Sequence, residues 1–263
     1  MRKPRDRHCR LLRSPAWIPI MSIEAPLRQA RNSAAFWAAT GRSRGHEVLR
    51  RRGFLAVAGD ERAGLRVLIQ EPGLTGEEVA EITELAARAK GPVDAEDPFS
   101  VTDLSHLGDM RSWQMPVMLR PPTPVAEPSM EVARVHGEAD LWAAERAVIA
   151  GFELARFEPY AEGEMFPMAL LGQPGIEVFV ARLDGEVAGA CVTAVEDGFG
   201  SHYWVGTPPA FRSRGVGRAV MLGSLAPLAG LPVTLTASKA GRPLYESLGF
   251  TVVGQATWWA SRS

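Results

Sequence analysis

The sequence predicts a protein of the α/β (α+β) class on three observations. Stretches with a period of two residues alternate with stretches of helical period along the 263 residues. Asp184 and Gly185 separate two β-rich runs, and this pair is typical of a hairpin turn because both central residues adopt positive φ. A glycine-containing turn at residues 207–217 joins a strand-like run to an apolar helix-like run. Strands and helices are therefore expected to alternate.

The first part of the chain has its own α/β order. Thr75 and Glu78 have the spacing of a capping box and predict the start of a helix. The predicted elements are a helix at 28–40, strands at 54–58 and 65–70, a helix at 76–90 and a strand near 113–119.

Four prolines between residues 121 and 128 mark the richest break in the pattern. Proline removes a backbone donor and favours extended chain, so we place a domain boundary here. The predicted organisation is a basic disordered leader at 1–21, an N-terminal α/β domain at 22–120, a Pro-rich linker at 121–129 and a C-terminal domain at 130–263.

Elements follow one another closely after this boundary. Pro227 ends the helix that begins at the glycine turn. The predicted elements are a strand at 131–135, a helix at 138–150, strands at 176–183, 187–195 and 200–205, a helix to about 226, a strand at 233–236, a short helix at 241–248 and a last strand at 250–259.

Composition excludes several classes of protein. The first 21 residues hold six Lys and Arg against Asp6, while the whole chain has a net charge of -1, so the rest is acidic and nucleic-acid binding through the leader is a weak alternative. No run reaches the roughly 18 apolar residues of a membrane helix. Cys9 and Cys191 have no partner spacing, which fits a reducing cytoplasm, and the five histidines show no metal-ligand spacing, so no metal is predicted.

The glycine turn has the features of a phosphate-binding site. The N-terminus of a helix carries unpaired N–H groups and a partial positive charge. Gly215 and Gly217 leave those groups uncovered, and Arg212, Arg214 and Arg218 add positive charge around the same turn. The arginine and glycine pattern alone is a weak signal, since both residues are common in surface turns.

Two segments in the right order carry a family resemblance. Residues 205–218 closely resemble the acetyl-CoA signature of the GNAT family of N-acetyltransferases, and residues 244–250 resemble that family's second signature. The resemblance covers about the last half of the chain. It implies a mixed, mostly antiparallel sheet flanked by helices, with a smaller N-terminal α/β domain that is a degenerate second GNAT-like half without a cofactor site.

The resemblance also implies roles for particular residues. The strand ending at residues 205–207 would pair with pantetheine, and the backbone of residues 212–217 would hold the diphosphate. Tyr245 would protonate the leaving thiolate, with core packing as the alternative. The implied cofactor-binding residues are Val205, Gly206, Thr207, Arg212, Ser213, Arg214, Gly215, Val216, Gly217, Arg218 and Ser238. For Ser238, helix capping explains the residue equally well.

The general base is left between two residues. Glu196 ends one predicted strand, and His202 lies within the next, where members of the family hold a carboxylate or position a water molecule. A histidine has a suitable pKa for this task at neutral pH, although a lone histidine in a strand is more often structural.

The function expected is transfer of an acetyl group from acetyl-CoA to a primary amine of a small molecule or peptide by direct attack, without a covalent enzyme intermediate. The alternative is a CoA-binding sensor or scaffold module without turnover. Acetyl-CoA is the expected cosubstrate, with no metal, no nucleic acid and no membrane as partners. A homodimer is kept as an open alternative to a monomer.

Overall fold

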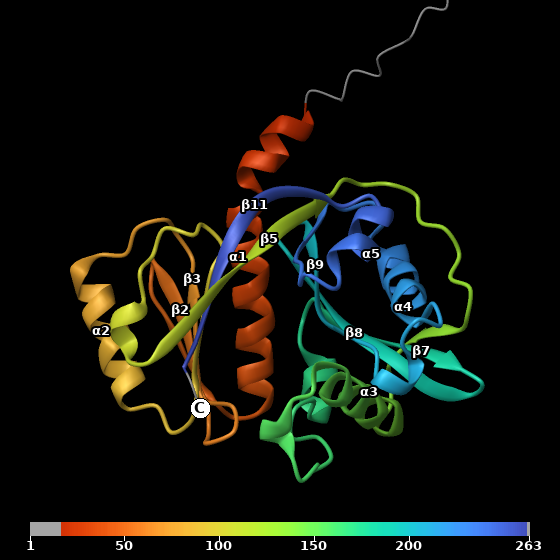
Figure 1. The fold of residues 1–263 in the computed structure, drawn as a ribbon, viewed down its shortest axis with the longest axis horizontal. Helices are drawn as coiled ribbons and strands as arrows, with labels where there is room; N and C mark the ends of the chain where they lie inside the picture. Colours follow the sequence, from red (N-terminus) through yellow and green to blue (C-terminus); the bar gives the residue numbers. More distant parts are fainter. Residues whose placement is uncertain (1–16, 262–263) are drawn as a thin grey trace, which may run out of the picture.

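A single sheet runs through the whole of the computed structural model, with helices on both faces (Figure 1). The structure describes residues 17–261, and it describes side chains from Glu24 onward. Of the predicted leader at 1–21, residues 1–16 lie outside this range, and residues 17–21 belong to the first helix. The helices are α1 (Trp17–Ser43), α2 (Gly76–Ala87), α3 (Glu138–Phe152), α4 (Val216–Leu225) and α5 (Arg242–Ser247).

Within the described residues the sheet has eleven strands in the order β1-β2-β3-β4-β11-β5-β10-β9-β8-β7-β6. Only the pairs β3–β4 and β9–β10 are parallel. The predicted fold class, a mixed and mostly antiparallel sheet flanked by helices, is confirmed. The strands are β1 (Glu47–Arg50), β2 (Phe54–Ala58), β3 (Leu65–Ile69), β4 (Val93–Asp97), β5 (Met110–Arg120), β6 (Val132–Arg134), β7 (Ile176–Leu183), β8 (Glu186–Glu196), β9 (Phe199–Gly206), β10 (Val233–Thr236) and β11 (Thr251–Ser261).

The order of elements repeats along the chain. In the N-terminal half (residues 17–120) a helix is followed by three antiparallel strands, a helix, a parallel strand and a long strand, and the C-terminal half (residues 132–261) has the same order from α3 to β11. The last strand of each half pairs outside that half: β5 pairs with β10, and β11 pairs with β4. The two exchanged strands also pair with each other and cross the middle of the molecule together (Figure 1).

Helices cover the sheet on both sides. On one face, α1 and α3 pack together, and Phe36 and Leu141 share a buried cluster with Val192 of β8. On the opposite face, α4 packs over Cys191 through Val216, and α2 and α5 cover other parts of the same face. Helix α1 contacts strands of both halves, so it lies between them (Figure 1).

Most predicted elements are confirmed, and the differences have physical causes. The capping box of Thr75 and Glu78 is present, and Asp184 and Gly185 have φ values of 54° and 84° in the hairpin. Helix α1 begins before residue 28 because it continues through Pro26. Strands β1 and β4 were not predicted. The hydrophobicity pattern does not indicate β4, because three of its five buried residues are acidic.

The Pro-rich segment 121–129 follows β5 as extended chain. The guanidinium of Arg120 donates to the carbonyl oxygens of Thr123 and Pro124, both at 3.0 Å, and the Thr123 N–H donates to Ala229 O at 3.1 Å. The segment is therefore fixed to the C-terminal half. Between residues 17 and 261, no helix combines the length and apolar character needed to cross a membrane.

Candidate active site

The turn between β9 and α4 is open at the surface. A short 3-10 helix, Pro209–Phe211, leads into it, and Ser213 and Gly215 have positive φ values of 61° and 82°. Residues 212–215 are exposed, and Gly215 is the N-cap of α4. The predicted strand, turn and helix are thus confirmed, with Gly215 directly before the helix and Gly217 in its first turn.

Backbone N–H groups of this turn have no protein acceptor. The first helical bond of α4 runs from Ala219 N to Gly215 O at 3.0 Å. Within the described part of the chain, none of the N–H groups from Ser213 to Arg218 donates to a protein group, and α4 has no side-chain cap. A helix N-terminus in this state binds an anion or water, and left-handed residues among right-handed ones bring successive N–H groups together into an anion-binding hollow.

Three arginines surround the turn and are partly engaged by the protein. The Arg212 guanidinium donates to Gly151 O at 3.0 Å, which ties the turn to the end of α3. Arg214 pairs with Asp184 at 3.1 Å, and Arg218 donates to the Ser247 hydroxyl at 2.9 Å. All three are exposed, so they add positive charge that a phosphate can reach.

Strands β9 and β10 separate soon after they meet. Their parallel ladder has only two register pairs, Gly200 with Val233 and Ser201 with Thr234. Beyond Ser201, β9 continues beside β8, while β10 continues beside β5. The edge of β9 from His202 to Gly206 therefore has no strand beside it on the β10 side, and an extended ligand can pair with this edge.

A bulge lies on this free stretch of β9. The register with β8 shifts between Ala190 and Val192, so Cys191 faces both Trp204 and Val205, and Trp204 has φ of 54°. A bulge turns a backbone amide out of the ladder. Such an amide could polarise a thioester carbonyl at the point where β9 and β10 separate.

The end of β9 packs backbone to backbone against α3. A Cβ on Gly206 would lie 3.1 Å from Cα of Val148, and a Cβ on Gly151 would lie 2.8 Å from the nitrogen of Thr207. The close neighbour that requires glycine at 206 is thus helix α3.

Tyr245 of α5 lies in the buried cluster beneath α4 and α5, 9% exposed, with its ring 6.0 Å from that of Phe250. Burial raises the pKa of Tyr245, and the nearby Cys191 thiol adds to this rise. Cys191 faces the bulge of β9, so the phenol lies near the bulge. Among the described residues the phenol hydroxyl has no hydrogen-bond partner, although it is not sealed from solvent. It is available to a ligand.

Ser238 closes the turn that leads into the short helix α5, whose N-cap is Gly241. Its hydroxyl accepts from the Gly241 N–H at 3.1 Å, and its carbonyl accepts from Arg242 N at 3.0 Å. The Ser238 side chain therefore orders the turn before α5 without capping the helix itself, and its cofactor role stays a prediction.

The two candidate bases, Glu196 and His202, do not lie together near Tyr245. His202 is buried, its Nε2 lies 2.9 Å from the Ser224 hydroxyl, and burial together with Arg120 lowers its pKa to about 3. Since Ser224 O–H donates to Val220 O, the hydroxyl oxygen accepts from Nε2. Glu196 is exposed beside the β8–β9 turn, five residues along the ladder from Trp204, or roughly 16 Å. Neither position supports proton removal at the bulge.

A buried polar strip beneath α1 escaped the sequence analysis. The Ser201 hydroxyl donates to Gln29 at 3.3 Å, the Gln29 amide donates to the Tyr203 hydroxyl at 3.5 Å, and the Ser33 hydroxyl donates to Glu96 Oε2 at 2.7 Å. Burial raises the pKa of Glu96 to about 7, against which Ser33 and Arg66 act. The alternation of acidic and apolar residues in Val93–Asp97 is the signal that could have indicated this strand.

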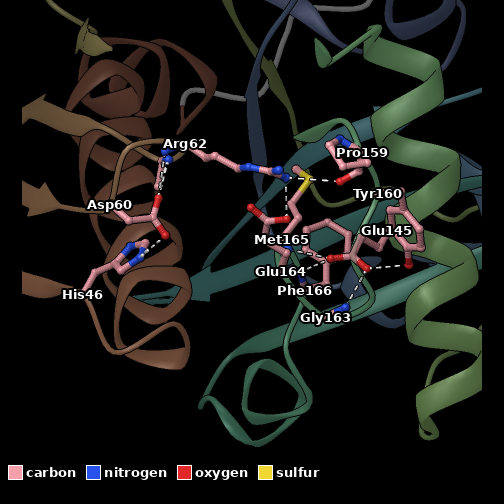
Figure 2. A network of polar contacts seen from close by, with 11 residues as sticks. His46, Asp60, Arg62, Glu145, Pro159, Tyr160, Gly163, Glu164, Met165 and Phe166 are labelled. Atoms are coloured by element: carbon pink, nitrogen blue, oxygen red, sulfur yellow. Dashed lines mark hydrogen bonds and ion pairs between the residues drawn. The ribbon is translucent and has the colours of Figure 1, made fainter. Parts of the chain in front are cut away.

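The loop between α3 and β7 closes the same face of the sheet. The buried carboxylate of Glu145 accepts from the Tyr160 hydroxyl and from the N–H groups of Gly163, Met165 and Phe166. Figure 2 shows Arg62 of the N-terminal half reaching this loop, where it donates to Pro159 O at 3.3 Å and to Glu164 at 2.8 Å. Residues of both halves therefore hold the loop in place.

Within residues 17–261, no group of three or more His, Cys, Asp or Glu side chains is arranged to hold a metal ion. Residues 174–252 match the model of the acetyltransferase (GNAT) domain. This range contains β7 to β10, the β9–α4 turn and Tyr245. No curated protein sequence matches the chain.

Solved structures share the whole two-part fold. A GCN5-related N-acetyltransferase from Kribbella flavida is 20% identical, with 89% of this chain and 96% of that chain covered and a TM-score of 0.61. A Novosphingobium aromaticivorans protein assigned to the GNAT family is 18% identical, with 82% and 91% covered and a TM-score of 0.57. The family model and the shared fold agree with the resemblance predicted from residues 205–218 and 244–250. Residues 174–252 of the chain therefore match a GNAT acetyltransferase domain, and the chain shares the fold of these solved structures.

Proposed function

We propose that the protein transfers an acetyl group from acetyl-CoA to a primary amine of a small molecule or peptide, by direct attack of the amine on the thioester. The proposal combines the GNAT domain at residues 174–252 with an open turn, a free strand edge and a phenol that lie in one region of that domain.

The observation that carries the proposal is the set of unpaired N–H groups from Ser213 to Arg218. Ser213, Arg214, Gly215 and Arg218 are exposed, the N–H groups stand at the positive end of a helix, and the two arginines add full charges beside them. A diphosphate supplies the acceptors that these groups lack. From this turn, pantetheine would follow the free edge of β9 toward the bulge at Trp204.

Tyr245 is the proposed donor of a proton to the departing thiolate. Because burial raises its pKa, the phenol stays protonated through neutral pH and can donate a hydrogen bond to sulfur. A cysteine-like thiol has a pKa of about 8.5, below that of the buried phenol, so the hydrogen bond from Tyr245 stabilises the charge on sulfur as the C–S bond breaks, and proton transfer to sulfur follows only as that charge develops. The backbone amide at the bulge is the proposed donor to the thioester oxygen.

Calorimetric titration with CoA, followed by an assay of thiol release from acetyl-CoA, tests the proposal. The acceptors in the assay are spermidine, lysine, an alanine tripeptide and an aminoglycoside. We expect CoA binding, and thiol release that depends on one of these amines. Binding without release on a broad amine panel favours the sensor or scaffold alternative, and no binding at millimolar CoA contradicts both.

A further inference from the structure

Glu96 is a buried carboxylate with an unused acceptor. It is 1% exposed, its Oε2 accepts from Ser33, and its Oε1 has no hydrogen-bond partner within the described protein. A buried carboxylate oxygen without a donor is costly, so such a group is either protonated or completed by a ligand. Glu96 belongs to β4 of the N-terminal half. No other residue of that half takes part in the proposed acyl transfer.

The polar strip beneath α1 connects Glu96 to the place where β9 and β10 separate. Ser201 and Thr234 form the last paired rung of these strands, and both side chains are buried. The Ser201 hydroxyl contacts Gln29, and Ser33, one helical turn further along α1, contacts Glu96. Residues four apart lie about 6 Å apart on one helix face. The carboxylate is therefore linked to the separation point through two side chains of one helix.

Aromatic side chains lie beside this strip. Trp37 follows Ser33 by one turn of α1, and its ring lies 5.8 Å from Trp204 at the bulge. Trp258 is the cross-strand partner of Glu96. Within the described residues, the indole N–H groups of Trp37 and Trp258 are also buried without partners, so α1, β4 and β11 each contribute an unpaired polar atom beside the strip. A polar ligand or water molecules would satisfy them.

The charged groups around Glu96 come from several elements. Arg66 of β3 lies 4.2 Å from the Trp37 ring and pairs with Asp94 at 2.9 Å, and Arg156 reaches the same carboxylate at 3.3 Å. Asp97 of β4 disfavours the charged form of Glu96, whereas Arg66 favours it. From β9, the phenol of Tyr203 faces Glu96, and α1 contributes only the neutral side chains of Gln29 and Ser33.

We propose that Glu96, supplied by the N-terminal half, takes the proton from the acceptor amine in the acyl transfer of the C-terminal half. This inference rests on the proposed function. The proton leaves the acceptor nitrogen for the Glu96 carboxylate, directly or through one water molecule. The nitrogen forms a C–N bond with the acetyl carbon, the C–S bond breaks, and its electron pair goes to sulfur, which takes a proton from Tyr245. Exchange with water returns both side chains to their starting states.

The decisive variant is Glu96→Gln, which keeps the size of the side chain and an acceptor for Ser33. We expect it to bind CoA within twofold of the wild type and to lower kcat by roughly 10²- to 10³-fold, the usual contribution of a general base. The decline of wild-type activity below about pH 7 should disappear in this variant. Ser33→Ala removes a donor to the carboxylate and should shift that decline upward by about one pH unit.

Asp97→Asn is the matched control, because Asp97 is also buried on β4 but its carboxylate accepts from the N–H groups of Phe99, Val101 and Thr102. This variant should be less stable than the wild type and should keep the wild-type pH dependence of activity. A merely structural role for Glu96 predicts the same behaviour for E96Q, and that result overturns the proposal.

An infrared measurement keeps the test independent of the acceptor. In the CoA complex, the difference spectrum between wild type and E96Q should show a protonated carboxyl band that is lost with a midpoint near pH 7. A carboxyl that stays ionised from pH 5 to pH 9 contradicts the inference. If the wild type binds no CoA, the proposed function fails; if it binds CoA and E96Q retains full turnover, only the role of Glu96 fails.

Discussion

The turns β3–α2 and β9–α4 occupy equivalent places in the two halves but are chemically opposite. At the start of α2, the Glu78 carboxylate accepts from the N–H groups of Thr75 at 3.0 Å and Gly53 at 2.7 Å, and the Thr75 hydroxyl accepts from Glu78 N. At the start of α4, Gly215 offers no side chain and the N–H groups stay open. The N-terminal half supplies its own anion where the C-terminal half leaves room for one.

The parallel strands beside these turns also differ, because they pair over a longer stretch in the N-terminal half. Strands β3 and β4 keep four register pairs, from Leu65–Val93 to Leu68–Glu96, whereas β9 and β10 keep two. The pairing of β2 with β3 is also regular, without the bulge that β9 has. Both halves contain a strand, a helix and a parallel strand in this order, so these elements alone do not distinguish the two turns. Three local features distinguish the C-terminal half, where we propose the CoA site: an uncapped helix, separated strands and a bulge.

Arg218→Glu should have the largest effect, because it makes the start of α4 resemble the start of α2. Residue 218 has the same position in α4 as Glu78 has in α2, so a carboxylate there would fill the turn with the protein's own anion. An acidic residue in the first turn favours the helix, and the fold should survive. We expect CoA affinity to fall about a thousandfold, through a lost charge-assisted bond and added repulsion.

Calorimetric titration with CoA measures this effect. Arg50→Glu makes the same change of charge on the exposed strand β1 and serves as the control. Equal affinities of the two variants would show that the diphosphate does not use the β9–α4 turn.

Glu96→Gln tests how a buried carboxylate of the N-terminal half affects the free energy of unfolding. Because burial raises the Glu96 pKa from 4.5 to about 7, the folded protein keeps a proton that the unfolded chain has released between these values. Wild-type stability therefore falls as the pH rises through this range, and E96Q removes the loss. The variant should be more stable than the wild type at pH 8, by up to about 3 kcal/mol, and by little at pH 5. Urea unfolding at both pH values checks this.

Thr75→Ala removes the hydroxyl half of the capping box in the N-terminal half. We expect a loss of about 1 kcal/mol in the free energy of unfolding and no change in CoA affinity. Thr75→Ser keeps the hydroxyl and should restore the stability. A loss of CoA affinity in T75A would show that the two turns are coupled.

Arg62→Ala should have the smallest effect. It removes the contacts with Pro159 and Glu164 that join the halves in Figure 2. Since Arg62 and Glu164 are both partly exposed, we expect less than about 1 kcal/mol, with a further decrease at high salt. A double-mutant cycle with Glu164→Gln measures the coupling, and several kcal/mol would mean that this ion pair, and not the exchanged strands, holds the halves together.

The sequence predicts what is local and misses what the fold brings together. The β9–α4 turn is recognisable because its glycines and arginines are close in sequence and each has a local reason. Glu96 is not recognisable in this way, since it lies more than a hundred residues before Tyr203 in the sequence and is brought near it by the packing of helix α1. Glu196 and His202 are close to the turn in sequence, but one lies at the far end of the ladder and the other faces α4.

The exchange of β5 and β11 makes the two halves of the chain mutually dependent. Removing β11 would uncover β4 in one half and β5 beside the other in a single step, because the same strand is hydrogen-bonded to both. Neither half has a complete set of neighbours until residue 261 is in place. The sheet therefore closes only when β11 pairs with both strands, and any chain in which β11 is not yet paired exposes the edges of β4 and β5 to other proteins.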